Sequence, residues 1–300
     1  MPDDLDIRRG LATDLAVCQQ IFDEAWAELH ERFGIPYEEQ GGDPDWLRPI
    51  LQHFLRTDPD AFLVGSIDDN AVAFGSAFQR DRYWCLSFLF VRPSFQGRGF
   101  GRILLEGLMP QDPDVECATV VESFQPVSTG LYAAFGITPR AIKYWLSGVS
   151  RTSELLAFPH DLSRHEVSDA DLPDIDALDR SILGFARSSD HQWWREADTP
   201  SWCYRRRGGL VAYAYIDDGF LGPVLATDEA TLAAVVADAL RHSDDAASMS
   251  INLCGNSGQV FKMLIAAGAK IDPSDPHRYI YCSDTRPLPA SYIHHSDWLP

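Results

Sequence analysis

The sequence predicts a mixed α/β fold, arranged as two tandem domains that each have a mixed central sheet flanked by helices. Strand-like and helix-like segments alternate along the chain, and the order of the first half restarts near residue 165. A glycine-rich turn also joins a buried strand to a helix within the first half. At 300 residues the chain is long enough for two ordinary domains, which we place at 1–150 and 151–300.

The first half divides into alternating elements before the glycine turn. A short strand over 5–9 precedes a long helix, Leu15–Phe33, which carries apolar residues at helical spacing. Residues 34–45 are rich in turn-forming residues, and a second helix is expected over 46–55. A hairpin then follows, formed by strands over 61–67 and 71–78, before the apolar strand Trp84–Val91.

The glycine turn, Gln96–Gly101, lies between this strand and a helix that opens with Ile103. A strand–turn–helix of this kind directs unpaired backbone N–H groups and a positive helix end at an anion. Glycines let the backbone approach a phosphate closely, because no Cβ intervenes. The turn is neither a Walker A loop, since no Gly-Lys-Ser/Thr follows, nor a dinucleotide fingerprint, whose glycine spacing differs.

The turn resembles the signature of the GNAT acyltransferases, Gln/Arg-x-x-Gly-x-Gly/Ala, at every fixed position. Val91-Arg92-Pro93 before it is similar to the Val-x-Pro step of that family. After a strand over 118–123, residues 125–136 resemble the Asn…Leu-Tyr-x-x-x-Gly-Phe motif, with Gln125 for Asn and with Phe135-Gly136 inverted. The order of the predicted elements is also that of the family, so the resemblance covers nearly all of the chain but is specific only over 84–136.

The resemblance implies acetyl-coenzyme A as co-substrate. In the family the backbone of the strand end holds the pantetheine arm, an N–H there polarises the thioester carbonyl, and the turn holds the pyrophosphate. It also implies that Gln125 bonds the cofactor near its thiol and that Tyr132 is the general acid for the departing thiolate. As an alternative, Tyr132 is a packed aromatic of its helix. The cofactor-binding residues carried over are Leu89, Phe90, Val91, Gln96, Gly97, Arg98, Gly99, Phe100, Gly101, Arg102 and Gln125.

The general base does not carry over from the family. The position that holds a Glu in several members is Cys85 here, a poor base on a buried strand that is better explained by packing. Ser87, Glu122 and a chain of water molecules remain open, and Glu122 is the only ionisable group on the following strand.

The resemblance also implies that the loop over 34–46, between the first two helices, walls the acceptor site. Tyr37, Glu38, Glu39 and Trp46 are the candidates there, against the alternative of a solvated surface loop. Trp193 and Trp194 either form an aromatic wall across the cleft between the halves or pack the repeat interface, and packing is favoured.

The second half repeats the element order without the phosphate cradle. His165–Val167 and the Ser168-Asp-Ala-Asp-Leu172 run are similar to Ile7–Arg9 and its following turn. Asp228 and Glu229 stand where the glycine turn would be, and carboxylates there would repel a polyanion. Leu264 aligns with Tyr132, so the proton donor is also missing. We therefore expect no acyl-coenzyme A in this half, which instead shapes the acceptor site or supports the structure.

Composition excludes several classes of partner. A net charge of −19 argues against nucleic acid, and it either attracts a cationic substrate or maintains solubility. The N-terminus lacks the layout of a signal peptide, and no apolar run is long enough for a membrane span. The six scattered cysteines are expected to be buried free thiols, without metal-ligand spacing, in a cytoplasmic protein.

These observations together predict an N-acetyltransferase that moves an acetyl group directly from acetyl-coenzyme A to a small-molecule amine. A non-catalytic acyl-coenzyme A sensor, another acyl donor and a hydroxyl acceptor are the alternatives. The sequence leaves the acceptor and the oligomeric state open.

Overall fold

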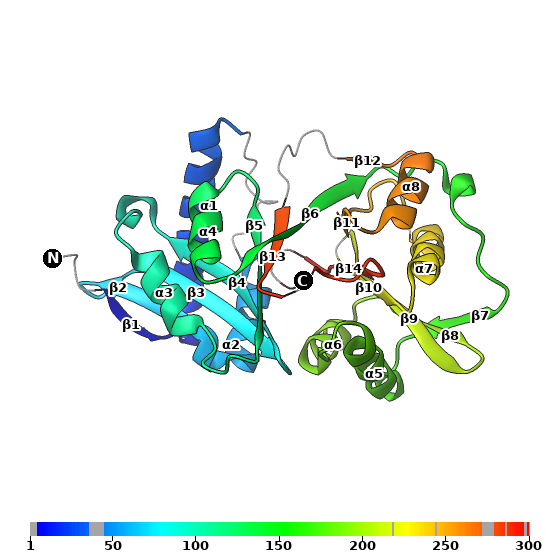
Figure 1. The fold of residues 1–300 in the computed structure, drawn as a ribbon, viewed down its shortest axis with the longest axis horizontal. Coiled ribbons are helices and arrows are strands. Elements are labelled where there is room, and N and C mark those ends of the chain that lie inside the picture. The colour runs from blue at the N-terminus through cyan, green and yellow to red at the C-terminus, as the bar shows by residue number, and fades with distance from the viewer. Residues whose placement is uncertain are drawn as a thin grey trace. The chain divides into compact units, whose positions relative to one another are not determined.

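The computed structural model describes residues 5–35, 45–217, 219–243, 245–271, 279–285, 287–296 and 299 (Figure 1). Its contacts divide the chain into two compact units, one made of Met1–Thr119 with Phe124–Ile137 and the other of Val120–Ser123 with Thr138–Pro300. These units follow contacts rather than the sequence repeat, so the domain boundary at residue 150 stays a prediction. Each unit contains strands and helices, and the predicted mixed α/β class is confirmed.

The strands of the first unit follow the order β1-β2-β3-β4-β5 within a nine-stranded sheet, antiparallel except for the parallel pair β4–β5. A short 3₁₀ turn, η1 (Ala12–Asp14), leads from β1 into α1. The strands are β1 (Asp6–Arg9), β2 (Phe62–Ile67), β3 (Asn70–Arg80), β4 (Tyr83–Val91) and β5 (Glu116–Glu122). The helices are α1 (Leu15–Phe33), α2 (Arg48–Thr57), α3 (Phe100–Leu108) and α4 (Pro126–Ala134).

Helices cover both faces of this sheet. Phe22 of α1 packs on Phe88 and Phe90, with ring centroids 6.4 and 4.7 Å apart, so α1 covers the face that carries these β4 side chains. A Cβ at Gly75, which lies next to Phe74 on β3, would meet Leu108 of α3 at 2.7 Å. Because successive strand residues point to opposite faces, α3 covers the other face.

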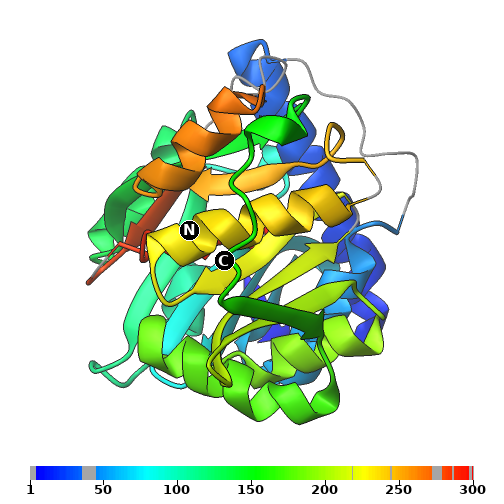
Figure 2. The ribbon, with the colours of Figure 1, turned by 90° about the vertical axis from the view of Figure 1, so that its right-hand side faces the viewer.

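The second unit contains a five-stranded antiparallel sheet, together with the strands β13, β6, β11 and β12 of the nine-stranded sheet (Figure 2). The five-stranded sheet has the order β14-β10-β9-β8-β7, and β6 pairs antiparallel with β11, β12 and β13. The strands of the second unit are β6 (Thr138–Ser147), β7 (Leu162–Glu166), β8 (Ser201–Arg206), β9 (Gly209–Asp217), β10 (Phe220–Ala226), β11 (Ile251–Cys254), β12 (Lys270–Ile271), β13 (Tyr279–Ser283) and β14 (Tyr292–Ile293). Its helices are α5 (Leu172–Ile182), α6 (Ser188–Glu196), α7 (Glu229–His242) and α8 (Gly258–Ala266).

The predicted repeat is visible in how each half begins. Arg8 of β1 forms two hydrogen bonds to the Asp14 carboxylate, at 2.6 and 2.8 Å, and that carboxylate accepts the Leu11 amide at 2.8 Å. In the second half His165 of β7 contacts Asp171 at 2.9 Å, and Asp171 accepts the Ser168 amide at 3.0 Å. Each aspartate lies six residues after its basic partner and ends a 3₁₀ turn that leads into a helix.

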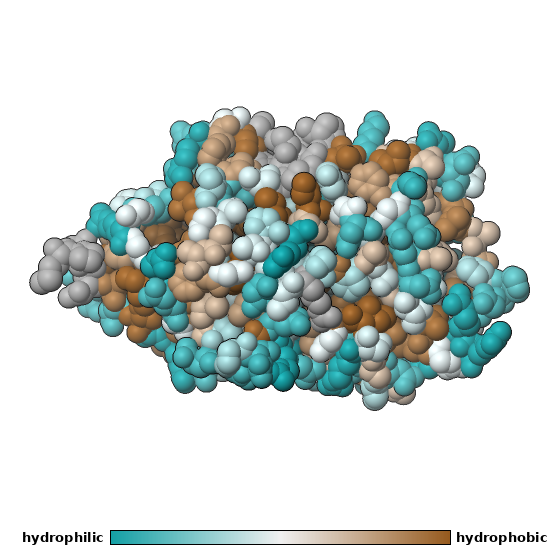
Figure 3. Space-filling view, in the orientation of Figure 1, coloured by the Kyte–Doolittle hydropathy of each residue, from teal (hydrophilic) through white to brown (hydrophobic). Residues whose placement is uncertain are grey.

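Large apolar side chains at the surface are few and scattered. Val127, at 70% exposure, is the most exposed of them, and others occur singly, such as Leu11 and Ile103. On the face drawn in Figure 3, hydrophilic and hydrophobic residues are intermixed. Single exposed apolar residues of this kind need no partner to explain them. Across the part of the chain that the structure describes, no helix is both long and apolar enough to span a bilayer.

Candidate active site

The candidate site begins where β4 and β5 separate. Their parallel ladder ends at Leu86 and Thr119, and the Thr119 hydroxyl donates to the Leu86 carbonyl at 2.9 Å. β4 continues to Val91 against β3, with a register shift that leaves Ser87 as the extra residue. Among the described residues, no strand pairs with β4 on the β5 side beyond Leu86. The edge of β4 on the β5 side is therefore open beyond Leu86.

The register identifies which backbone groups face this open edge. The Arg92 amide donates to the Val72 carbonyl at 2.8 Å, so residues 72 and 92 form a hydrogen-bonded pair. Hydrogen-bonded and non-hydrogen-bonded pairs alternate in an antiparallel ladder. The backbone N–H and C=O groups of Phe90 consequently point at β3. The N–H and C=O groups of Leu89 and Val91 point at the open edge instead. Of the three expected pantetheine-binding residues, these two have the suitable orientation.

The glycine turn after β4 leaves its surface uncovered. Gly97 and Gly99 have φ values of +76° and +86°, and a Cβ built on either would meet nothing within 4 Å. Gly99 is the N-cap of α3, and the first amide bonded back within the helix is that of Ile103, to the Gly99 carbonyl at 3.1 Å. The amides of residues 100–102 thus precede the intrahelical bonds, as at any helix start. An exposed cradle of this shape suits a phosphate anion.

Side chains around the turn divide into braces and exposed cations. Gln96 is a brace, because its Nε2 donates to the Val91 carbonyl at 3.0 Å and its Oε1 accepts from Arg32 of α1 at 3.1 Å. The Arg98 guanidinium donates to the Ser94 carbonyl at 3.2 Å, and that of Arg102 lies 3.8 Å from Glu106. Both arginines are exposed, so weak surface contacts hold them. Sequence reasoning missed Arg32, because it is 64 residues away from the turn it braces.

The helix α4, which contacts α3 beside the turn, carries two further candidates. A Cβ at Gly101 would lie 3.8 Å from the Leu131 side chain, so α3 and α4 are in contact there. Gln125 is the N-cap of α4, and its Oε1 is buried with no hydrogen-bond partner among the described residues. A buried acceptor without a partner is costly, which makes it a fit for a donor on a bound molecule. Tyr132 lies near the end of α4 with 6% of its surface exposed.

The candidates for the base lie on the two separating strands. Cys85 is 1% exposed, and its thiol lies 3.8 Å from the Leu86 carbonyl, in agreement with packing. Glu122, 5% exposed, ends β5 within the segment that clusters with the second unit. Its role as base stays a prediction.

The predicted acceptor-binding residues are only partly described. Tyr37, Glu38 and Glu39 lie outside the described residues. Trp46 contacts Phe22 edge to face, with ring centroids 5.5 Å apart. It is thus a member of the aromatic cluster on α1.

Packing accounts for one of the two tryptophans of α6. Trp194 is 1% exposed and lies 5.1 Å from the Tyr215 ring, centroid to centroid. Trp194 therefore packs inside the second unit, and the Trp193 ring lies 6.4 Å from the His295 ring, centroid to centroid. Packing of these tryptophans at the repeat interface stays a prediction.

In the second unit, carboxylates occupy the start of α7, which corresponds to the cradle, and one of them also reaches the start of α8. Asp228 caps α7 by accepting the Thr231 amide and hydroxyl, each at 2.8 Å, and Glu229 accepts the amide of Gln259 in the first turn of α8. Burial opposes ionisation of Asp228, but the hydrogen bonds from Thr231 outweigh it and lower its pKa. The positive ends of both helices are thereby neutralised from within the chain.

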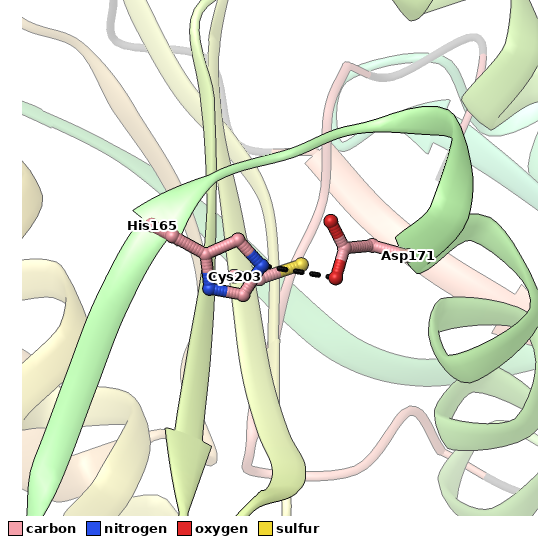
Figure 4. Close-up of side chains that lie close together, drawn as sticks. All are labelled: His165, Asp171 and Cys203. Carbon is pink, nitrogen blue, oxygen red and sulfur yellow. Dashed lines mark hydrogen bonds and ion pairs between the residues drawn. The ribbon is translucent and has the colours of Figure 1, made fainter.

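The cysteine prediction is confirmed, since all six thiols are free and buried. One of them belongs to a cluster that the sequence did not indicate. His165, Asp171 and Cys203 have donor atoms within 4.8 Å of one another (Figure 4). Burial raises the pKa of the Cys203 thiol to about 12. Asp171 also accepts Arg205 at 2.9 Å, and it repeats the capping role of Asp14. A cap within the repeat explains this cluster without a metal.

Comparison with known proteins identifies the first of these regions. Residues 19–137 match the Acetyltransferase (GNAT) family, which confirms the resemblance of the glycine turn. By this match, residues 19–137 resemble a GNAT acyltransferase domain. No curated protein sequence matches the chain.

Solved structures show the same fold over nearly the whole chain. A presumed acetyltransferase from Pyrococcus horikoshii has a TM-score of 0.75 at 12% identity, with 99% of this chain and 96% of that one covered. A tandem GNAT protein from the clavulanic acid biosynthesis pathway has a TM-score of 0.58 at 14% identity, covering 93% and 98%. A GCN5-related N-acetyltransferase from Sphaerobacter thermophilus has a TM-score of 0.56 at 15% identity, covering 96% and 98%. At these identities the likeness concerns the fold.

Proposed function

We propose that this protein is an N-acetyltransferase that moves the acetyl group of acetyl-coenzyme A directly to the amine of a small molecule. The observation that carries the proposal is the open cradle at Gly97 and Gly99, next to the open edge of β4. The cradle would hold the pyrophosphate and the strand edge the pantetheine arm, and the buried Gln125 Oε1 would accept a hydrogen bond from the cofactor near its thiol.

The reaction needs a polarised carbonyl, a deprotonated amine and a protonated leaving group. A backbone N–H of Leu89 or Val91, directed at the open edge, would stabilise the negative charge on the thioester oxygen. The amine nitrogen forms the new C–N bond and the C–S bond breaks. Tyr132 would then give its proton to the thiolate. Glu122 is our candidate for accepting the proton of the amine.

The charge of the chain supports an amine acceptor. With a net charge of −19, the surface attracts cations, and most amines are protonated at neutral pH. The acceptor must nevertheless lose a proton before it attacks, so a base is required within reach of the open edge. We place the reaction in the cytoplasm, where six buried thiols remain reduced.

Two measurements on the purified chain test the proposal. Isothermal titration calorimetry with acetyl-coenzyme A should give one site per chain, because among the described residues only the first half carries an open cradle. Thiol release with a panel of primary amines, alcohols and water should then be stimulated by an amine. Binding without stimulated release by any of them would favour the sensor, stimulation by an alcohol would reassign the reaction to O-acetylation, and absence of binding would refute the cofactor.

A further inference from the structure

The last segment of the chain adds a strand to β10 in the second unit. β14 pairs antiparallel with β10, with Val224 opposite Ile293 and Leu225 opposite Tyr292. The Ala226 amide also donates to the Ser291 carbonyl at 3.0 Å. Tyr292, Ile293 and the following His294 are at most 1% exposed, so this segment lies inside the unit.

The place that β14 occupies corresponds to the open edge of β4 in the first unit. β10 contacts the chain before β11 in parallel, through the bridge Phe220–Ser250, and its pairing with β9 shifts register between Leu221 and Val224. β4 has the same sequence of features, namely a parallel contact with the next strand, a register shift and then a departure from that strand. Beyond the shift the edge of β4 is open, whereas that of β10 is paired with β14, which also lies against β11.

One glycine makes this close approach of backbones possible. A Cβ at Gly222, within the register shift of β10, would lie 2.0 Å from the carbonyl oxygen of His294 and 2.9 Å from its carbonyl carbon. These are backbone atoms, which cannot rotate away as a side chain would. Gly222 therefore serves a segment of the same chain, while Gly97 and Gly99 face open space.

A buried polar network holds the segment in place. The Arg187 guanidinium donates to the Tyr292 hydroxyl at 2.5 Å and to the Asp179 carboxylate at 3.1 Å. Asp179 and Arg187 are both fully buried, so each depends on its partners for the hydrogen bonds that water would otherwise supply. At the far end of the segment, His295 contacts Asp217 of β9 at 2.8 Å.

We propose that the second unit retains the cofactor slot of the fold as a strand-accepting site, and that residues 291–295 of the same chain are its resident ligand. The comparison with a pantetheine arm rests on the proposed function, whereas the position of the segment does not. This half is then closed to acyl-coenzyme A twice, by carboxylates where the phosphates would lie and by a peptide strand where the arm would lie.

Hydrogen exchange with mass spectrometry on the full chain, without cofactor, tests the proposal. Gly222→Ala should expel the segment, raising amide exchange at least tenfold over 287–296 and 224–226, while α7 and β9 keep their protection. Gly209→Ala is the matched control in the same sheet, because its Cβ would lie an ordinary 3.7 Å from the nearest atom. Unchanged exchange over 287–296 would overturn the proposal. So would a loss of protection throughout the unit, because the strand would then be an integral part of its core.

Tyr292→Phe decides the matter if Gly222→Ala does not fold. It keeps the ring and removes the hydrogen bond from Arg187, so a smaller rise confined to the same two regions supports the proposal. No rise, or a rise across the unit, overturns it. Neither readout depends on acetyl-coenzyme A, so this test and that of the proposed function fail independently.

Discussion

Replacement of Gly99 by alanine tests the cradle most directly. Gly99 has a φ of +86°, and its Cβ would point into a space without any atom within 4 Å. In the free protein the substitution therefore introduces backbone strain without a collision. Such strain costs about 1–2 kcal/mol of stability for a residue with a side chain.

The effect on cofactor binding should exceed this strain. The added methyl group lies on the surface that the pyrophosphate would approach, so it displaces the anion from at least one backbone amide. A hydrogen bond to a charged group contributes about 1.5–3 kcal/mol. We therefore expect the Kd for acetyl-coenzyme A to rise by roughly ten- to a hundredfold. The larger Gly99→Val should abolish measurable binding.

The matched control is Gly208→Ala in the β8–β9 hairpin. Gly208 has the same φ of +86° and equally open space around its Cβ, so it carries the same strain outside the cradle. Thermal unfolding should show a similar loss of stability for both variants, whereas calorimetry should show weaker binding for Gly99→Ala alone. Equal Kd values for the two variants and the native chain would refute the cradle, and equal weakening by both would attribute the effect to strain.

Three other perturbations probe the rest of the chain. Tyr132→Phe should lower turnover by roughly ten- to a thousandfold at nearly unchanged Kd, which is the loss expected for a positioned proton donor. Cys85→Ala should keep most of the activity. Full activity of Tyr132→Phe would show that Tyr132 is a packing residue. Truncation after residue 150 should cause aggregation that light scattering detects, because β6 loses its partners β11 and β13. A monodisperse fragment with native acceptor selectivity would contradict a role of the second half in supporting the first. Burial, with the nearby charges of Lys143 and Arg187, lowers the pKa of His294 well below 6.5, so stability should fall by about 1.4 kcal/mol per pH unit below that value. Denaturant unfolding at pH 7 and pH 5 checks this, and His294→Gln should lose less stability than the native chain over that range.

The sign of this pH dependence follows from which state binds the proton. Unfolded His294 titrates near 6.5, whereas the folded protein keeps it neutral to lower pH. Acid therefore favours the unfolded state, and the stabilisation is present above 6.5 and lost as the pH falls. An equal pH dependence in His294→Gln would show that other groups are responsible.

Local patterns were sufficient to predict most elements of the fold. The helix predicted over Leu15–Phe33 has these bounds in the structure. Its apolar stripe identifies the face that is buried, and the glycine at residue 34 ends the helix. The hairpin strands β2 and β3 also lie within about two residues of their predicted bounds. Such elements depend on periodicity and caps, which are encoded within a few residues of each other.

The short C-terminal strands were not predicted from the sequence. β12 and β14 contain two residues each, too few to show any period, and both exist because a distant strand offers them a partner. The bracing of Gln96 by Arg32 and the cluster of His165 with Cys203 likewise join residues that are far apart along the chain. Contacts of this kind are decided by the packing of whole elements.

The sequence by itself determined the resemblance to the GNAT family and the place of the glycine turn, because the turn and its glycines depend on local backbone conformation. It also determined that the second half lacks this cradle, since Asp228 and Glu229 stand at the start of α7. Only the tertiary structure decided which backbone groups of β4 face an open edge, because that depends on the register with β3. Only the tertiary structure likewise decided that β14 fills the matching edge of β10, because strand pairing brings together backbones about 70 residues apart, as a pattern within a single strand cannot.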